Sequence, residues 1–266
     1  MLGAIIGDIV GSRYEWNNIK TKDFGLFADE CEPTDDSIMS LAVAKAILDF
    51  DGDYEKLSAD SVKYMREVGQ NYPNCGYGGN FFFWIFSPET PKPYNSFGNG
   101  SAMRVSACGF AAGSLDEAKK LSEAVTRVSH NHPEGLKGAE AVAAAIYLAR
   151  TGASISEIRG YINDNYYKLD FTLDEIREGY SFDVSCQGST PQALEAFLES
   201  TSFEDAIRNA VSIGGDSDTI AAMAGGIAEA YYGIPALIRE KAMYYLDERL
   251  TDIVCEFERK YPPKVI

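Results

Sequence analysis

Apolar residues recur about every 3.6 positions along most of the chain, whereas strict apolar–polar alternation is scarce. The first pattern is typical of helices and the second of half-buried strands. Alanine and glycine are common in these segments, which lets helices pack closely and be buried on most sides. We therefore predict an all-α protein with about ten helices. The helical spacing is clear at 38–48, 121–128 and 142–149.

Local signals mark where several of these helices begin and end. A hydroxyl three residues before a glutamate is the capping-box pattern of a helix start, and it occurs at Ser114, Ser154 and Thr172. Thr190 before Pro191 predicts a further start, with proline in the first helical position. Glycines stand where helices would stop, at Gly152, Gly214 and Gly233.

The stretch 73–101 departs from this helical pattern. It holds five glycines, four prolines and eight aromatic residues in 29 positions. Loops of this length inside a compact domain are usually functional or disordered, and the aromatic content argues against disorder. No repeat, low-complexity tract or linker divides the chain, so we predict one domain over residues 1–266.

Composition limits the partners of this protein. Its 266 residues include 40 acidic and 24 basic side chains, and the formal net charge is −16. Nucleic acids and anionic membrane surfaces attract clustered Lys and Arg, and no run here is longer than two, so neither partner is expected. The most apolar window, 219–238, contains Glu229 and is interpreted as a buried helix followed by a turn, not as a membrane span.

The cysteines and the N-terminal segment bear on the cellular compartment. The five cysteines are odd in number and form no CxxC motif, which disfavours a disulfide framework and a cysteine-based zinc site. The apolar N-terminal segment carries Asp8 and lacks a basic region, unlike a secretory signal. We expect a cytoplasmic protein.

Two acidic segments are the first candidates for chemistry. TDDS at 34–37 and GGDSDT at 214–219 each directly precede a predicted helix, near Ile38 and at Ile220. Asp, Ser and Thr there could simply cap the helices. Two close carboxylates exceed what a cap needs, however, and they repel each other unless a positive charge lies between them. Oxygen ligands of this kind suit magnesium, manganese or calcium, not zinc.

Two further features are weaker signals. The glycine-rich segment at 98–101 could bring backbone N–H groups against phosphate oxygens, but ordinary turn glycines explain it as well. The only histidines, His130 and His132, lie just before Pro133. They could contact a ligand, but helix capping is the default interpretation, because one HxH is insufficient for a metal site.

Taken jointly, these segments resemble the ADP-ribosylglycohydrolase family. The resemblance runs from Gly3 to Gly233, which is most of the chain, and the combination of TDDS with GGDSDT is specific. Its five blocks are GAIIGDIVGSRYE at 3–15, TDDS at 34–37, SFGNGSAMR at 96–104, SHNHPEG at 129–135 and GGDSDTIAAMAGGIAEAYYG at 214–233.

The resemblance implies an all-α orthogonal helical bundle with a dinuclear metal cleft that holds two divalent cations, usually magnesium or manganese. The metal ligands it implies are Thr34, Asp35, Asp36, Asp216, Asp218 and Thr219. The ADP-ribose contacts it implies are Ser96, Phe97, Gly98, Asn99, Gly100 and His130. It implies catalysis by Glu15 beside the metals, together with Asp36 and Asp218, although Ser12-x-x-Glu15 also fits a capping box.

The function this resemblance implies is hydrolysis of the ADP-ribose glycosidic bond in ADP-ribosylated protein side chains or small-molecule acceptors, with release of ADP-ribose. Two cations could hold the ribose hydroxyls and orient a water, and a nearby carboxylate could exchange the proton. Two alternatives stay open. One is a non-catalytic ADP-ribose-binding or crystallin-like structural relative, and the other is a metal hydrolase of a different N-glycoside.

Overall fold

The structure is a computed structural model that describes residues 1–263. Within this range it contains helices and no strand, and Gly98 and Ser185 form one isolated antiparallel bridge. The predicted all-α class is confirmed. The helices are α1 Leu2–Ser12, α2 Asp35–Leu48, α3 Tyr54–Gly69, α4 Gly79–Phe86, the 3-10 turn η1 Asn99–Ser101, α5 Ser106–Ala111, α6 Leu115–Thr126, α7 Pro133–Arg150, α8 Ile155–Asn165, α9 Leu173–Ile176, α10 Cys186–Leu198, α11 Phe203–Ser212, α12 Ser217–Tyr232, α13 Ala236–Met243 and α14 Glu248–Lys260.

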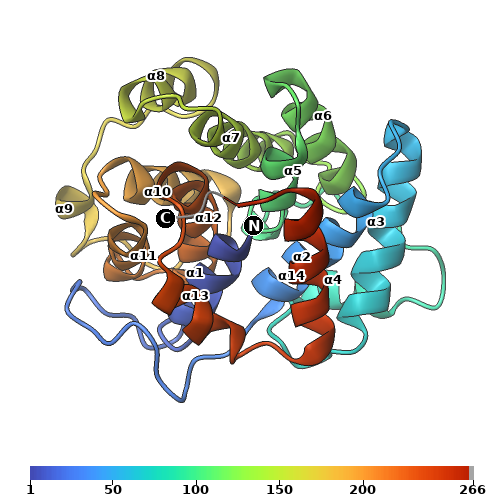
Figure 1. Cartoon of the computed structure of the whole chain (residues 1–266), viewed down its shortest axis with the longest axis horizontal. Coiled ribbons are helices and arrows are strands. Elements are labelled where there is room, and N and C mark those ends of the chain that lie inside the picture. Colours follow the sequence, from blue (N-terminus) through green and yellow to red (C-terminus); the bar gives the residue numbers. More distant parts are fainter. Residues whose placement is uncertain (264–266) are drawn as a thin grey trace.

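Helices α1 and α12 pack against each other near the middle of the bundle, with the other helices around them (Figure 1). Glycines let the two backbones approach closely. A Cβ on Gly7 would stand 2.0 Å from the carbonyl oxygen of Ala221, and one on Gly11 would stand 2.4 Å from the Cα of Asp218. The helices run antiparallel, so the end of α1 lies beside the start of α12.

Helix α12 is buried along almost its whole length, from Ser217 to Ala230. It ends at Tyr232, and the next residue, Gly233, has a φ of +82° that favours glycine. The expectation of a buried helix followed by a turn is therefore confirmed.

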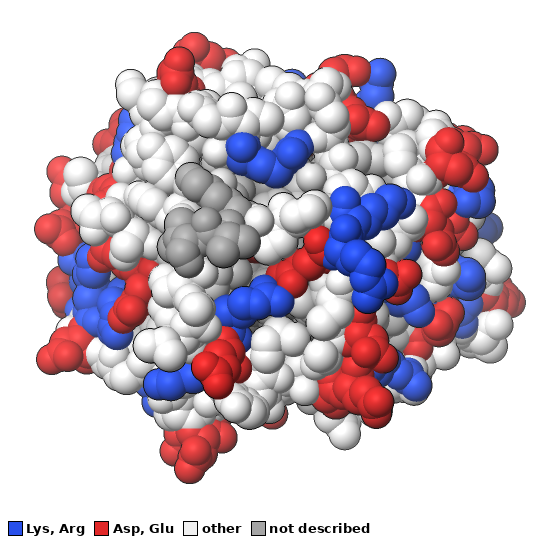
Figure 2. All heavy atoms as spheres, in the orientation of Figure 1, with Lys and Arg blue, Asp and Glu red and all other residues white. Residues whose placement is uncertain are grey.

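Within the part of the chain that the structure describes, no helix is both long and apolar enough to cross a membrane. On the face drawn in Figure 2, Lys and Arg side chains stand among acidic ones.

The capping signals are only partly correct. Ser154 and Thr172 form complete capping boxes with the glutamates three residues later. Ser114 caps α6, but the Glu117 carboxylate accepts from the Gly113 N–H and not from Ser114. The prediction of a start at 190–191 is wrong. Helix α10 begins five residues earlier, at Cys186, because the side chain of the preceding serine caps it, and the proline lies inside the helix.

The stretch 73–101 is not one continuous loop. It contains the eight-residue helix α4, whose Phe81, Trp84 and Ile85 are buried, and it ends in the turn η1. The expectation of order from the aromatic content is confirmed. Short helices such as α4 and α9 also explain why the described residues hold fourteen α-helices, more than the ten or so expected.

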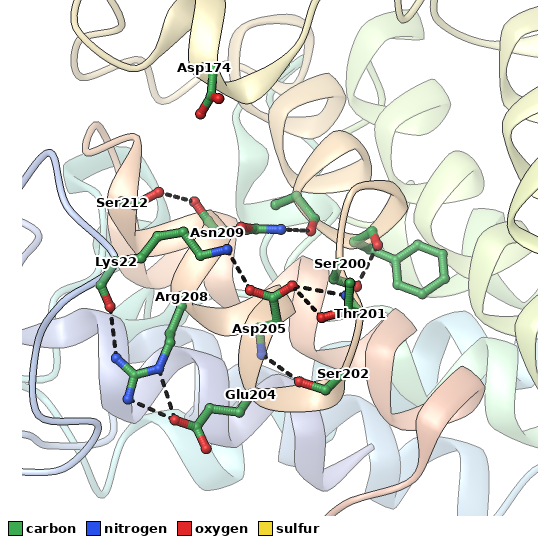
Figure 3. A network of polar contacts seen from close by, with 12 residues as sticks. Lys22, Asp174, Ser200, Thr201, Ser202, Glu204, Asp205, Arg208, Asn209 and Ser212 are labelled. Atoms are coloured by element: carbon green, nitrogen blue, oxygen red, sulfur yellow. Dashed lines mark hydrogen bonds and ion pairs between the residues drawn. The ribbon is translucent and has the colours of Figure 1, made fainter.

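The connection between α1 and α2, residues 13–34, is fastened to α11 (Figure 3). Lys22 forms an ion pair with Asp205. Arg208 donates from Nη1 to the carbonyl oxygens of Lys22 at 2.9 Å and Phe24 at 2.7 Å, and it pairs with Glu204. These bonds matter for the site below, because the same connection carries Glu15.

Candidate active site and metal centre

The two acidic segments meet where the N-termini of α2 and α12 converge beside α1. Thr219 donates from Oγ1 to Asp36 Oδ2 at 3.1 Å, and Thr34 Oγ1 lies 3.5 Å from Asp218 Oδ2. Residues distant in the sequence are thereby brought into one buried cluster.

Capping accounts for only part of this cluster. Thr34 does cap α2, since its side chain accepts from the Asp36 N–H. Asp216 occupies the N-cap position of α12, yet its side chain makes no capping bond there. Its Oδ2 instead accepts from Asn99 Nδ2 at 2.7 Å. The carboxylates are therefore arranged for something other than helix initiation.

Five carboxylates form two overlapping groups. One oxygen each from Asp8, Asp36 and Asp218 lie within 4.8 Å of one another, and the same holds for Glu15, Asp216 and Asp218. Asp218 belongs to both groups. Asp35 belongs to neither: it lines the neighbouring cavity, and its backbone N–H donates to the carbonyl oxygen of Cys75 at 2.8 Å.

Asp8 is a member that the sequence analysis did not select. It is fully buried in α1, where its carboxylate accepts from the backbone N–H groups of Thr34 at 2.9 Å and Ser37 at 3.0 Å and from both of their hydroxyls. It thus fixes the first turn of α2 to α1. The available signal was a lone aspartate inside an otherwise apolar helix, because a buried charge needs partners.

Burial and mutual repulsion favour the protonated form of these carboxyls when no cation is present. Burial, then the charges of Asp216 and Asp8, raises the pKa of Glu15 to about 7. Burial, then neighbouring carboxylates, raises the pKa of Asp35 to about 8 and holds those of Asp36 and Asp218 well above their usual range.

The cluster fits divalent cations that prefer oxygen. Asp36 Oδ1 is buried and has no hydrogen-bond partner within residues 1–263, so it is free to ligate. The Thr34 and Thr219 hydroxyls donate their protons to Asp8 and Asp36, which leaves oxygen lone pairs available. Carboxylate and hydroxyl oxygens with no cysteine or histidine match magnesium or manganese better than zinc.

Glu15 does not form the capping box that its spacing allowed. Ser12 is the last residue of α1, and its hydroxyl donates to the Ile9 carbonyl oxygen at 2.9 Å. Glu15 lies beyond the helix end, half-buried in the wall of the cavity.

The cavity beside the carboxylates has a volume of about 370 Å³, within the range of roughly 300–1,000 Å³ for small-molecule sites. Five of the six predicted ligand-contacting residues line it: Ser96, Gly98, Asn99, Gly100 and His130. The loop is held by Val184 and by the first residue of α10, because Asn99 N–H donates to Val184 O at 2.8 Å and Cys186 N–H donates to Phe97 O at 2.9 Å.

Phe97 is placed differently from the rest of that loop. Its side chain is 47% exposed, does not line the cavity and packs edge-on against His132, with ring centroids 5.3 Å apart. Another aromatic pair stands at the mouth, where Trp16 stacks on Phe182 with centroids 5.0 Å apart. No local pattern predicted this pair, because its members are distant along the chain.

The two histidines have separate roles. His132 Nδ1 accepts from the Glu134 N–H at 3.1 Å and caps α7, as expected by default. His130 is buried in the cavity wall, and burial, then the nearby Arg104 charge, holds its pKa well below the usual range. Arg104 also lines the cavity and was not among the predicted contacts.

Known proteins are similar to this chain in sequence and in fold. The chain is 26% identical to ADP-ribosylhydrolase ARH3 of Mus musculus, over 88% of this chain and 83% of that protein. It is 29% identical to ADP-ribosylarginine hydrolase Tri1 of Pseudomonas putida, over 89% of this chain and 70% of that protein. A solved structure described as an ADP-ribosylglycohydrolase-related protein complex has a TM-score of 0.68 at 22% identity, covering 97% of this chain and 95% of that one.

The last comparison shows that the fold is shared. The sequence also identifies the family, because the family model described as ADP-ribosylglycohydrolase matches residues 1–261, almost the entire chain. The chain therefore belongs to the ADP-ribosylglycohydrolase family of glycosidases.

Proposed function

We propose that this protein hydrolyses the glycosidic bond between ADP-ribose and a protein side chain or small-molecule acceptor, and releases ADP-ribose. The observation that carries the proposal is that Glu15, Asp36, Asp216 and Asp218 line the same cavity as Ser96, Gly98, Asn99 and Gly100. The similarity to relatives named as ADP-ribosylhydrolases supports this substrate class.

Two cations, magnesium or manganese, would be held by the two overlapping carboxylate groups. Asp218 belongs to both groups and would be the shared ligand. Asp36 and Asp216 are the other ligands proposed from these groups, and Thr34, Asp35 and Thr219 are proposed ligands from outside them. Of the remaining members, Asp8 would fix α2 and Glu15 would handle the proton. When bound, the cations supply positive charge that can hold ribose hydroxyls and lower the pKa of water.

The segment Ser96–Ser101, here called the glycine loop, would bind the diphosphate part of the ligand. Gly98 and Gly100 line the cavity without side chains, so backbone can approach a ligand closely there. Asn99 links the loop to the carboxylates through Asp216, which would keep phosphate and sugar subsites in register. Phe97, half-exposed outside the cavity, would meet only a part of the ligand that extends past the loop.

Glu15 would handle the proton. Its carboxylate lies in the cavity wall, within 4.8 Å of carboxylate oxygens of Asp216 and Asp218, where it can exchange a proton with a water or with the leaving group. Negative charge around the sugar would also favour the oxocarbenium character of a glycoside-cleaving transition state.

The test is a panel of defined ADP-ribosyl linkages, including arginine and serine, incubated with the protein and magnesium or manganese. Detection of free ADP-ribose from at least one linkage, absent with Asp218→Asn, supports the proposal. ADP-ribose binding without turnover of any linkage would favour a non-catalytic relative. Neither binding nor turnover would point to a hydrolase of another glycoside.

A further inference from the structure

A buried chain of polar groups lies behind the glycine loop. Arg104 is fully buried and donates from Nη2 to Ser129 Oγ at 2.8 Å. Ser129 Oγ lies 2.8 Å from His130 Nδ1. The guanidinium carbon lies 5.4 Å from the ring centroid of Phe81, a cation–π arrangement. None of these contacts belongs to the carboxylate cluster.

The available protons determine which atom donates and which accepts among Arg104, Ser129 and His130. The Arg104 guanidinium has only donors, so Ser129 Oγ must accept from it. Ser129 has one hydroxyl proton, and within residues 1–263 its only other recorded hydrogen-bond partner is His130 Nδ1. Donation to Nδ1 gives the Ser129 hydroxyl proton an acceptor and gives Nδ1 a donor, while Arg104 Nε and Nη1 have no partner among the described residues. If Nδ1 carried the proton instead, the fully buried Ser129 hydroxyl proton would be left without an acceptor.

This arrangement leaves the ring proton of neutral His130 on Nε2. Nε2 lies 3.4 Å from the point where a Cβ on Gly100 would stand and 3.6 Å from that point on Gly98. Among the described residues it has no hydrogen-bond partner, and His130 lines the cavity. An N–H donor therefore faces the ligand side of the loop.

We propose that Arg104 and Ser129 are positioning residues that hold His130 in its Nε2–H tautomer, so that His130 is a fixed hydrogen-bond donor to an anionic oxygen of the ligand and not a proton acceptor. The identity of the ligand as a diphosphate ester rests on the proposed function. The tautomer does not, because it follows from contacts within the ligand-free chain. The buried Arg104 charge behind the ring also favours an anion in front of it.

The first test measures the tautomer in the wild-type protein without ligand. Long-range ¹H–¹⁵N correlation spectra distinguish a protonated from an unprotonated ring nitrogen. The chain has only two histidines, and His132→Asn assigns the signals because asparagine is also a good N-cap. We expect a protonated Nε2 and an unprotonated Nδ1 on His130. A protonated Nδ1 would overturn the proposal without any question of misfolding.

The second test compares Ser129→Ala with Ser129→Thr. Alanine removes the donor to Nδ1, so we expect mixed tautomers and about a tenfold loss of ADP-ribose affinity, whereas threonine retains the hydroxyl and should restore both. Ser122→Ala is the matched control. Ser122 lies on α6 and is fully buried like Ser129, but its hydroxyl has no partner among the described residues. It should leave both readouts unchanged.

The outcomes separate this inference from the proposed function. An unaltered tautomer and unaltered ADP-ribose affinity in a folded Ser129→Ala protein would contradict the positioning role. A wild-type protein that shows the Nε2–H tautomer but binds no ADP-ribose would support the role of Arg104 and Ser129 and contradict the substrate class instead.

Discussion

Asn18 pairs its side-chain amide with both hydrogen-bonding groups of Gly215. Its Nδ2 donates to the Gly215 carbonyl oxygen at 2.8 Å, and its Oδ1 accepts from the Gly215 N–H at 2.8 Å. The same Nδ2 lies 3.0 Å from the carbonyl oxygen of Glu15. One side chain therefore joins the turn that carries Glu15 to the turn that carries Asp216. Gly214 and Gly215, with φ of +67° and +75°, give the second turn its shape.

Removal of this link should impair the site more than the fold. We expect Asn18→Ala to lower turnover by about 10–100-fold, the usual effect of losing a residue that orients the ligands of a metal site. Asn17→Ala is the matched control, since Asn17 is the exposed neighbour in the same turn. Steady-state rates and thermal melts of both variants make the comparison. Equal activity of the two would show that the link is not needed.

Asp36 and Asp218 should behave as one unit. Asp36→Asn and Asp218→Asn should each remove most activity, and the double variant should be little worse than either single one, because groups acting together are not additive. Ser154→Ala, which removes an ordinary cap on α8, should cost only about 0.5–2 kcal/mol of unfolding free energy and leave turnover near normal. If the aspartate variants also showed only a small loss of unfolding free energy and near-normal turnover, Asp36 and Asp218 would be helix-capping residues and not part of the active site.

Glu15 separates chemistry from binding. Glu15→Gln keeps the size of the side chain but removes its charge and basicity, so kcat should fall by roughly 10²–10⁴-fold while ADP-ribose affinity changes far less. Glu32→Gln, on the exposed surface of the same connection, is the control. Measurement of kcat and ADP-ribose affinity on each variant decides the matter. A near-normal kcat would remove Glu15 from the chemistry.

Without cations, the protein should become less stable as the pH rises. Folding raises the pKa of Asp8 to about 6, of Glu15 to about 7 and of Asp35 to about 8. Groups with raised pKa values favour the folded state fully below their ordinary values near 4, and this contribution is lost as the pH passes through the raised values. The melting temperature of chelated protein should therefore fall between about pH 5 and about pH 8.

Magnesium or manganese should offset the repulsion among the deprotonated carboxylates. The gain in melting temperature on adding either cation should therefore grow over the same pH interval. Asp218→Asn, with one carboxylate fewer, should show a shallower fall when chelated. A chelated wild-type protein whose melting temperature is constant or rises from pH 5 to pH 8 would contradict this electrostatic account.

The sequence predicted the helical class and the main acidic segments because both depend on local patterns. The helical period of apolar residues is visible within a short stretch of sequence, and Asp36 and Asp218 lie at helix N-termini that local capping residues indicate. The error at Pro191 has the same origin, since the stronger cap at Ser185 lies only five residues earlier and the sequence does not rank the two. Helix α4 was missed because its apolar run is too short to show a period.

The rest of the site depends on contacts that local patterns do not record. Asp8 is remote from the acidic segments in the sequence, and only the close packing of α1 on α12 brings it to Asp218. Asn18 is an exposed residue of an irregular connection, and its partner Gly215 is nearly two hundred positions away. Arg104 and Ser129 lie at the edges of two of the family blocks, 96–104 and 129–135, but no local pattern assigns them a role, so their relation to His130 required the folded chain.

The most direct measurement of the central claim is the release of ADP-ribose from an ADP-ribosylated substrate by one protein sample in three states: loaded with magnesium or manganese, exhaustively chelated, and reloaded. The convergence of Glu15, Asp36, Asp216 and Asp218 predicts turnover in the first state, its loss in the second and its return in the third. Full turnover in the chelated state would contradict the account.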